Sequence, residues 1–212
     1  MDESQGFRDG SRQQIPNTPN LIAQKEAIAE PLKAIEGFVV REDTGGRENM
    51  EVFCHSDLYL VETNDLEKAH NFIRKVIGLL DKSGESYAVS IFARHLPVVK
   101  KITYNPSNYK NLTLNVYEVS TMSGKNRVAP ASAGFIKHTV ASTSLNRKPV
   151  VVIDCIDTMA LYLTTQQLNS FLEELRDLIT ATEGLGFIII DPSIYDEKEL
   201  TQMRRFKSVI KI

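Results

Sequence analysis

The stretch "VVVIDCIDTM" at residues 150–159 decides the fold class. Its first four residues are β-branched and apolar, and Asp154 and Asp157 follow closely. A strand of unbroken hydrophobicity must be buried on both faces, which is typical of an inner strand in a parallel sheet. The sequence therefore predicts a parallel α/β core in which one inner strand ends at a carboxylate.

Strand-like and helix-like segments alternate on both sides of this stretch. Besides the strand "PVVVIDCI", short apolar runs predict strands over 58–62, 87–93, 112–119, 187–191 and 208–212. Apolar residues at helical spacing predict helices over 65–83, 133–144, 165–183 and 196–206. This alternation predicts an α/β three-layer sandwich around a mostly parallel sheet.

Capping residues support two of these helices. Asn64 with Glu67 three residues later is expected to cap the helix over 65–83, and Gly84 lies just beyond its end. Thr164 with Gln167 has the spacing of a capping box.

The chain before this region differs in composition. Residues 1–19 are polar and predict a flexible tail, whereas 20–56 predict a helix and a hairpin. Thr44-Gly45-Gly46 supplies the tight turn of a hairpin over 38–53. That hairpin either extends or covers a sheet edge within the chain, or it pairs with a strand of a partner. The α/β domain is expected over 57–212.

Composition excludes several classes of protein. A net charge of −2 and a pI near 6.1 argue against a general nucleic-acid binder. The basic clusters Lys100-Lys101 and Arg204-Arg205 with Lys207 are interpreted as solvated helix faces. Two cysteines and four histidines show no spacing typical of metal ligands, so no metal is expected. With no signal-like or membrane-spanning apolar stretch, a cytoplasmic protein is expected.

Three carboxylates are candidates for a ligand site. Asp154, Asp157 and Asp191 lie at the C-termini of predicted strands, and ligands of parallel α/β sheets bind beyond the carboxyl ends of strands. In nucleotide hydrolases an acidic strand end holds Mg²⁺ opposite a glycine-rich phosphate loop, G-x-x-x-x-G-K-[ST]. The three acids are therefore interpreted as the rim of a vestigial Walker B site.

The matching phosphate loop is missing. The first strand-to-helix junction, "LVETNDLEKAH", has no glycine and places Glu62, Asp65 and Glu67 where phosphates would lie. Gly124-Lys125 lacks the first glycine of the motif and has Asn126 where serine or threonine belongs. No G-x-S-x-G nucleophile motif occurs either. We expect no cofactor and no catalytic residue.

Further motifs lie in the C-terminal half. They are Asp154 at a strand end, Leu175-Arg176-Asp177 in a helix, Asp191-Pro192 after the next strand and Glu199-Leu200 in the last helix. In these the chain resembles RecA/KaiC-type ATPases. It is more similar to an uncharacterised, mainly archaeal family of RecA-like domains without the Walker A loop, and the similarity covers roughly 57–206.

This resemblance implies a RecA-like sheet with a degenerate P-loop. Members of that family often occur with sensory and histidine-kinase modules, which implies a regulatory or interaction role in signal transduction. The family has no established catalytic residues to transfer. The chain departs from its pattern at Cys155, where a glycine commonly follows the strand-end acid.

Three functions are compared. The first is a non-catalytic RecA-like domain that binds protein partners and, as RecA-like folds commonly do, other copies of itself. The second is an enzyme that binds nucleotides or hydrolyses phosphoesters, with a rearranged site built from Asp154, Asp157, Asp191 and Lys125. The third is a nucleic-acid-associated accessory protein, which is supported only by the basic clusters and by the resemblance to RecA. We favour the first.

Overall fold

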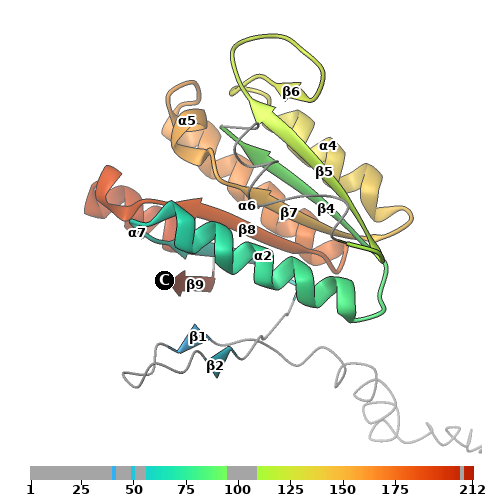
Figure 1. Cartoon of the computed structure of the whole chain (residues 1–212). Helices are drawn as coiled ribbons and strands as arrows, with labels where there is room; N and C mark the ends of the chain where they lie inside the picture. Colours follow the sequence, from blue (N-terminus) through green and yellow to red (C-terminus); the bar gives the residue numbers. More distant parts are fainter. Residues whose placement is uncertain (1–39, 42–48, 51–55, 95–108, 206–207) are drawn as a thin grey trace, which may run out of the picture. The chain divides into compact units, whose positions relative to one another are not determined.

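The computed structural model describes residues 40–41, 49–50, 56–94, 109–205 and 208–212. Seven strands form one sheet in the order β6-β5-β4-β7-β8-β3-β9, and every neighbouring pair is parallel (Figure 1). The strands are β3 (Leu58–Glu62), β4 (Tyr87–Ala93), β5 (Leu112–Val119), β6 (Arg127–Val128), β7 (Lys148–Ile153), β8 (Leu185–Ile190) and β9 (Ser208–Lys211). The predicted α/β class is confirmed.

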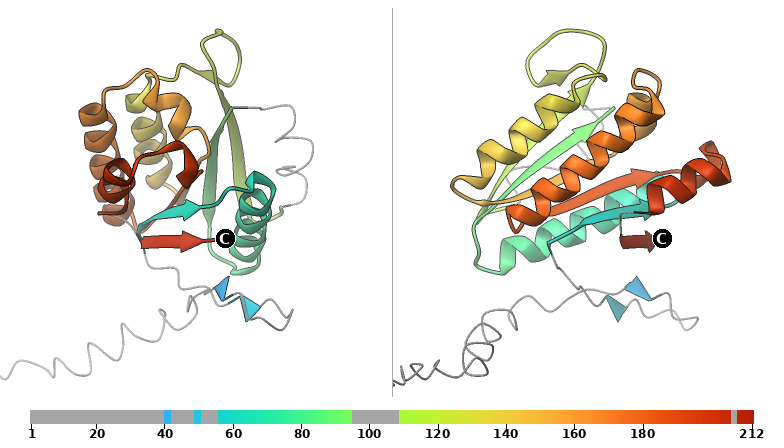
Figure 2. Two further views of the ribbon diagram at one scale, coloured as in Figure 1. Left: turned by 90° about the vertical axis from the view of Figure 1, so that its left-hand side faces the viewer. Right: turned by 180° about the vertical axis from the view of Figure 1, so that it is seen from behind.

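Helices cover both faces of this sheet (Figure 2). The helix α2 (Leu66–Lys82) packs on one face, where its buried side chains join an apolar cluster with β4, β7 and β8. The opposite face carries α4 (Ala133–Ser144), α5 (Ile156–Ala160), α6 (Thr165–Ala181) and α7 (Glu197–Arg204). A 3-10 turn, η4 (Pro192–Ile194), links β8 to α7. None of the helices in these ranges is both long and apolar enough to span a bilayer.

The strand that ends at Asp154 lies inside the sheet, as its composition predicts. β7 pairs with β4 on one side and β8 on the other, and its residues from Pro149 to Ile153 are buried. Its alternate side chains enter the two apolar clusters on opposite faces: Val150 and Val152 on the α2 side, Val151 and Ile153 on the α6 side. Burial on both faces explains why the strand has no polar alternation.

The two capping predictions differ in outcome. Thr164 and Gln167 form the predicted capping box at the start of α6. The cap predicted at Asn64 is wrong, because the N-cap of α2 is Asp65, whose carboxylate accepts the N–H groups of Glu67 and Lys68. Asn64 lies one residue before this cap and its side chain is exposed.

The predicted N-terminal hairpin is described only in part. β1 (Val40–Arg41) and β2 (Asn49–Met50) pair antiparallel, with Val40 opposite Met50, so the two runs pair with each other. The turn at Thr44-Gly45-Gly46, the tail over 1–19 and the helix expected after residue 20 lie outside the described residues.

Candidate functional site

The carboxyl edge of the sheet brings together the ends of β7, β8 and β3, which are neighbours in the strand order. A parallel sheet presents the carboxyl ends of all its strands on one edge, where ligands of α/β proteins usually bind. Asp154 follows β7, Asp191 follows β8, and Glu62 is the last residue of β3. Each of these acids has a different set of neighbours.

Glu62 is buried and fully paired. Its side chain is 4% exposed, and its two carboxylate oxygens accept the Nε and Nη2 hydrogens of Arg204 at 2.5 and 2.8 Å. This two-point geometry is the strongest arrangement for an arginine–carboxylate pair. Arg204, part of a basic cluster in the sequence, is therefore engaged within the fold.

The turn between β3 and α2 is held by its own polar side chains. The buried Thr63 hydroxyl accepts the N–H of Asp65 at 3.0 Å. The Asp65 carboxylate in turn accepts the N–H groups of Glu67 at 3.0 Å and Lys68 at 3.2 Å. Free N–H groups at a helix N-terminus are what bind phosphate in nucleotide-binding folds. In α2 a carboxylate of the chain already occupies them.

Asp154 has only one of its oxygens paired. Its Oδ2 lies 2.8 Å from Nε2 of His70, while Oδ1 is buried and has no hydrogen-bond partner. The residue is 7% exposed, so this oxygen is also shielded from solvent. A buried carboxylate oxygen without a hydrogen-bond partner is costly, so Asp154 is only half satisfied within the fold.

His70 is the site residue that sequence reasoning missed. The sequence pattern did not mark it as a site residue, yet its side chain is 13% exposed and contacts Asp154. The contact joins residues 84 positions apart, so no local spacing could reveal it. The only available signal was a histidine in the second turn of the helix that follows β3.

Asp157 and Cys155 complete the turn after β7. Asp157, in the first turn of α5, forms an ion pair with Arg94 at 2.6 Å. The Cys155 thiol is buried and lies 3.5 Å from the carbonyl oxygen of Phe92. Burial, with the nearby charges of Asp154 and Asp157, raises the pKa of this thiol well above its ordinary value. A thiol of this kind is not a ready nucleophile.

Asp191 has a local structural role. Its carboxylate caps η4 by accepting the N–H of Ser193 at 2.9 Å and the hydroxyl of Ser193 at 2.6 Å. These two bonds lower the pKa of Asp191. Across the described ranges, no three histidine, cysteine or acidic side chains are grouped closely enough to hold a metal ion.

The glycine-lysine pair does not lie at a helix N-terminus. Gly124 and Lys125 belong to the exposed loop that joins β5 to β6, and Asn126 after them has a φ of 59°. The chain then enters β6, and α4 begins only at Ala133. A phosphate loop must lead directly from a strand into a helix.

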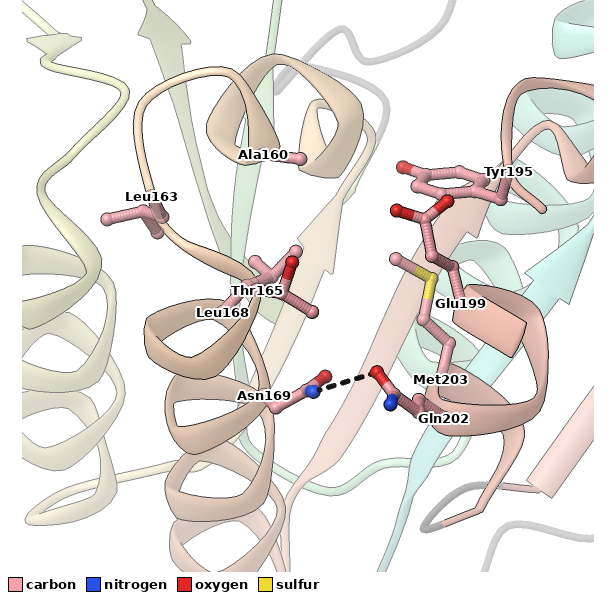
Figure 3. A pocket seen from close by; sticks show the side chains of 9 residues that line it. All are labelled: Ala160, Leu163, Thr165, Leu168, Asn169, Tyr195, Glu199, Gln202 and Met203. Atoms are coloured by element: carbon pink, nitrogen blue, oxygen red, sulfur yellow. Dashed lines mark hydrogen bonds between the residues drawn. The ribbon is translucent and has the colours of Figure 1, made fainter. Parts of the chain in front are cut away.

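A small pocket of about 80 Å³, open to solvent, lies beside this edge between α6 and α7 (Figure 3). Leu168 and Met203 form part of its apolar lining, and Asn169 donates a hydrogen bond to Gln202 at 3.3 Å across it. The hydroxyl of Tyr195 is buried without a hydrogen-bond partner. Burial and the negative charge of Asp157 raise the pKa of this hydroxyl. The hydroxyl therefore stays protonated, and a ligand atom that accepts its hydrogen bond would satisfy it.

Two comparisons with known proteins bear on this chain. No curated protein matches it. A family described as "Protein of unknown function (DUF835)" matches residues 60–206, which includes the end of β3, every helix described above and the turns that hold Glu62, Asp154 and Asp191. The chain belongs to the DUF835 family.

Proposed function

We propose that this protein is a non-catalytic, RecA-like domain that works as a regulatory or protein-interaction module. The observation that carries the proposal is the turn from β3 to α2. It contains no glycine, and Asp65 already accepts the N–H groups of Glu67 and Lys68. A triphosphate would have to displace a carboxylate and then lie beside further acids.

The contact between His70 and Asp154 supports the RecA-like part of the proposal. In Walker-type ATPases the helix after the phosphate loop faces the acidic end of another strand, and a magnesium ion sits between them. Here α2 faces the end of β7 in the same way, and the imidazole of His70 binds Asp154 directly at 2.8 Å. The imidazole of His70 thus contacts the strand-end acid where a magnesium ion would contact it in an ATPase.

Exposed apolar side chains support an interaction role. Eight large hydrophobic side chains are exposed in the described ranges, and six of them lie in segments at the carboxyl edge of the sheet. The six are Leu66, Met122, Phe135, Leu161, Tyr162 and Ile194. Exposed apolar residues gathered on one side of a domain are typical of a protein-binding surface. The sensory and kinase modules implied by the resemblance are partners of the right class.

Calorimetric titration with ATP and Mg²⁺, ADP and GTP tests the non-catalytic part. We expect no saturable heat from any of the three nucleotides. Micromolar affinity for one of them would refute the proposal, whatever partner the domain has.

Site-specific photocrosslinking in the native host tests the interaction part. A photoreactive residue at Leu161, which is 82% exposed at the carboxyl edge, is expected to capture one discrete protein. The matched control is Leu145, 81% exposed after α4 at the amino edge, which is expected to capture none. Equal capture from both positions would contradict a carboxyl-edge interface.

One observation favours a second candidate, a nucleotide-binding or phosphoester-hydrolysing enzyme. The unpaired Oδ1 of Asp154 is the kind of buried, unsatisfied group that active sites retain. Under this candidate, Asp154→Asn abolishes a measurable hydrolysis of nucleotide or phosphodiester substrates and leaves the melting temperature unchanged. If wild-type protein hydrolyses none of these substrates in the presence of Mg²⁺ or Mn²⁺, the candidate fails.

A further inference from the structure

The pocket between α6 and α7 combines apolar walls with a single carboxylate (Figure 3). Leu168 from α6 and Met203 from α7 line it, and both are buried members of the apolar core. Of the nine described residues that line the pocket, only Glu199 carries a charge. The pocket is therefore an apolar recess with a negative group beside it, and the lining holds no cation to balance that charge.

Glu199 has one oxygen engaged by the fold and one oxygen free. Its Oε2 accepts the N–H of Asp196 at 3.1 Å, which completes the capping box at the start of α7. Within the described ranges, Oε1 has no hydrogen-bond or ion-pair partner. Figure 3 shows this carboxylate directed into the gap beside the ring of Tyr195. A cation placed there would meet a free carboxylate oxygen and an aromatic ring, and both attract positive charge.

Further charges around the pocket are mainly negative. Burial raises the pKa of the Tyr195 hydroxyl, and nearby carboxylates raise it further. These carboxylates are Asp157, Glu199 and Asp191. Arg94 acts in the opposite direction, but it is already paired with Asp157 at 2.6 Å. The surroundings therefore favour a cationic ligand and oppose a phosphate or a carboxylate.

The size of the pocket limits the ligand. Its volume is about 80 Å³, whereas sites for cofactors and drug-sized molecules measure roughly 300–1,000 Å³. A bound Mg²⁺ or Ca²⁺ needs several oxygen ligands, and the lining offers one carboxylate. Lysine and arginine side chains match the pocket better, because each buries an aliphatic stem along apolar surface and ends in a charged head.

Exposed apolar residues adjoin the pocket on two sides. Leu161 and Tyr162 directly follow Ala160 of the lining, and Ile194 directly precedes Tyr195. Leu161 is 82% exposed and Ile194 is 58% exposed. A free amine in the pocket would leave these side chains uncovered. In a polypeptide, the residues next to a bound lysine or arginine would cover them, as the surroundings of an anchor residue do at protein interfaces.

We propose that the pocket between α6 and α7 binds a lysine or arginine side chain presented by a partner protein. The stem lies against Leu168 and Met203, and the charged head reaches Oε1 of Glu199. Apolar residues on either side of the cation contact Leu161 and Ile194. This inference rests on the proposed interaction role and adds the chemistry by which the partner segment is recognised.

Selection of peptides from a random library by the full chain tests the proposal. Enriched peptides should carry lysine or arginine at one fixed position beside an apolar residue, and selection by Glu199→Gln should lose this preference. Glutamine preserves the capping box of α7, as Gln167 does in α6. The matched control is Glu197→Gln, which removes an exposed carboxylate from the same helical turn outside the pocket. This control should select the same peptides as wild type.

Fluorescence anisotropy with one selected peptide measures the contribution of the charge. Norleucine in place of the peptide's lysine keeps the stem and removes the charge, and it should raise the dissociation constant at least about tenfold. Glu199→Gln should have a similar effect, and the two changes together should cost little more than either alone. Ala160→Leu narrows the pocket without touching Glu199 and should also weaken binding. Circular dichroism confirms that each variant is folded.

Four results would overturn the proposal. They are no enriched peptide, enriched peptides without a fixed cation, equal weakening by Glu197→Gln and Glu199→Gln, and self-association of wild type that Glu199→Gln abolishes, since the occupant would then be a second copy. Photocrosslinking at Leu161 separates this failure from that of the proposed function. Discrete capture at Leu161 together with any of the four results would refute the pocket assignment and retain the interaction role. Absence of capture would remove the interaction role itself.

Discussion

The turns that leave β3 and β7 both bury a carboxylate at the carboxyl edge, and they treat it differently. Glu62, the last residue of β3, has both oxygens bound by Arg204. Asp154 after β7 has one oxygen bound by His70 and the other unpaired. A fully paired buried acid stabilises the fold, whereas a half-paired one contributes little or is kept for another reason. The contrast separates a structural acid from a candidate functional one.

The largest expected effect is at Glu62. Glu62→Ala removes a buried two-point pair and leaves a gap beside Arg204, so we expect the free energy of unfolding to fall by about 2–3 kcal/mol. Urea unfolding at neutral pH measures it, with an unchanged m-value as the control for two-state behaviour. If Glu62→Ala lowered the free energy of unfolding by less than Asp154→Ala does, Glu62 would not be the more stabilising of the two acids.

The next effect is at His70. His70→Ala leaves Asp154 as a buried carboxylate with neither oxygen paired, and we expect a loss of about 1–2 kcal/mol. The double variant His70→Ala with Asp154→Ala should be more stable than His70→Ala alone, because the unpaired charge is gone. Simple addition of the two single effects would show that the contact contributes nothing.

A smaller effect is expected at Asp154. Asp154→Ala removes a carboxylate whose burial is only partly compensated, so the stability should fall by less than about 1 kcal/mol. Thermal unfolding of wild type, Glu62→Ala and Asp154→Ala under one buffer gives the ranking directly. A large loss of stability in Asp154→Ala would mean that Oδ1 of Asp154 has a hydrogen-bond partner in the folded protein in solution.

The smallest effect concerns Asp191 and depends on pH. Its pKa is lowered in the fold by Ser193, so the carboxylate stabilises the fold fully above its ordinary pKa of 3.8, and this stabilisation is lost as the pH falls through the lower folded value. Asp191→Asn should therefore differ from wild type in melting temperature at neutral pH, and the difference should shrink in acid. A difference that grows on acidification would contradict the assigned hydrogen bonds.

Long elements could be predicted from the sequence and short ones could not. β4, β5 and α4 have the bounds that apolar patterning indicates, because each is long enough for the spacing of its apolar residues to be recognised. β6 has two residues and α5 has five, which is too few for any period. The N-cap of α2 is Asp65 and not the predicted Asn64. Both residue types favour N-caps, and the sequence alone does not show that the Thr63 hydroxyl accepts the N–H of Asp65.

The candidate site divides in the same way. The positions of Asp154 and Asp191 at strand ends follow from the strand pattern. Their partners do not, because His70 and Arg94 reach this edge from α2 and from the end of β4. Contacts between distant segments depend on how the chain folds back across the sheet. The spacing of residues along the sequence therefore does not reveal these contacts.

The central claim is that α2 has no free N-terminus for phosphate, and amide NMR tests it most directly. The amide signals of Glu67 and Lys68, whose N–H groups bind Asp65, should stay unchanged when ATP and Mg²⁺ are added to millimolar concentration. A saturable shift of these two signals, with Thr63 and Asp65 following, would place a nucleotide against the turn after β3 and contradict the account.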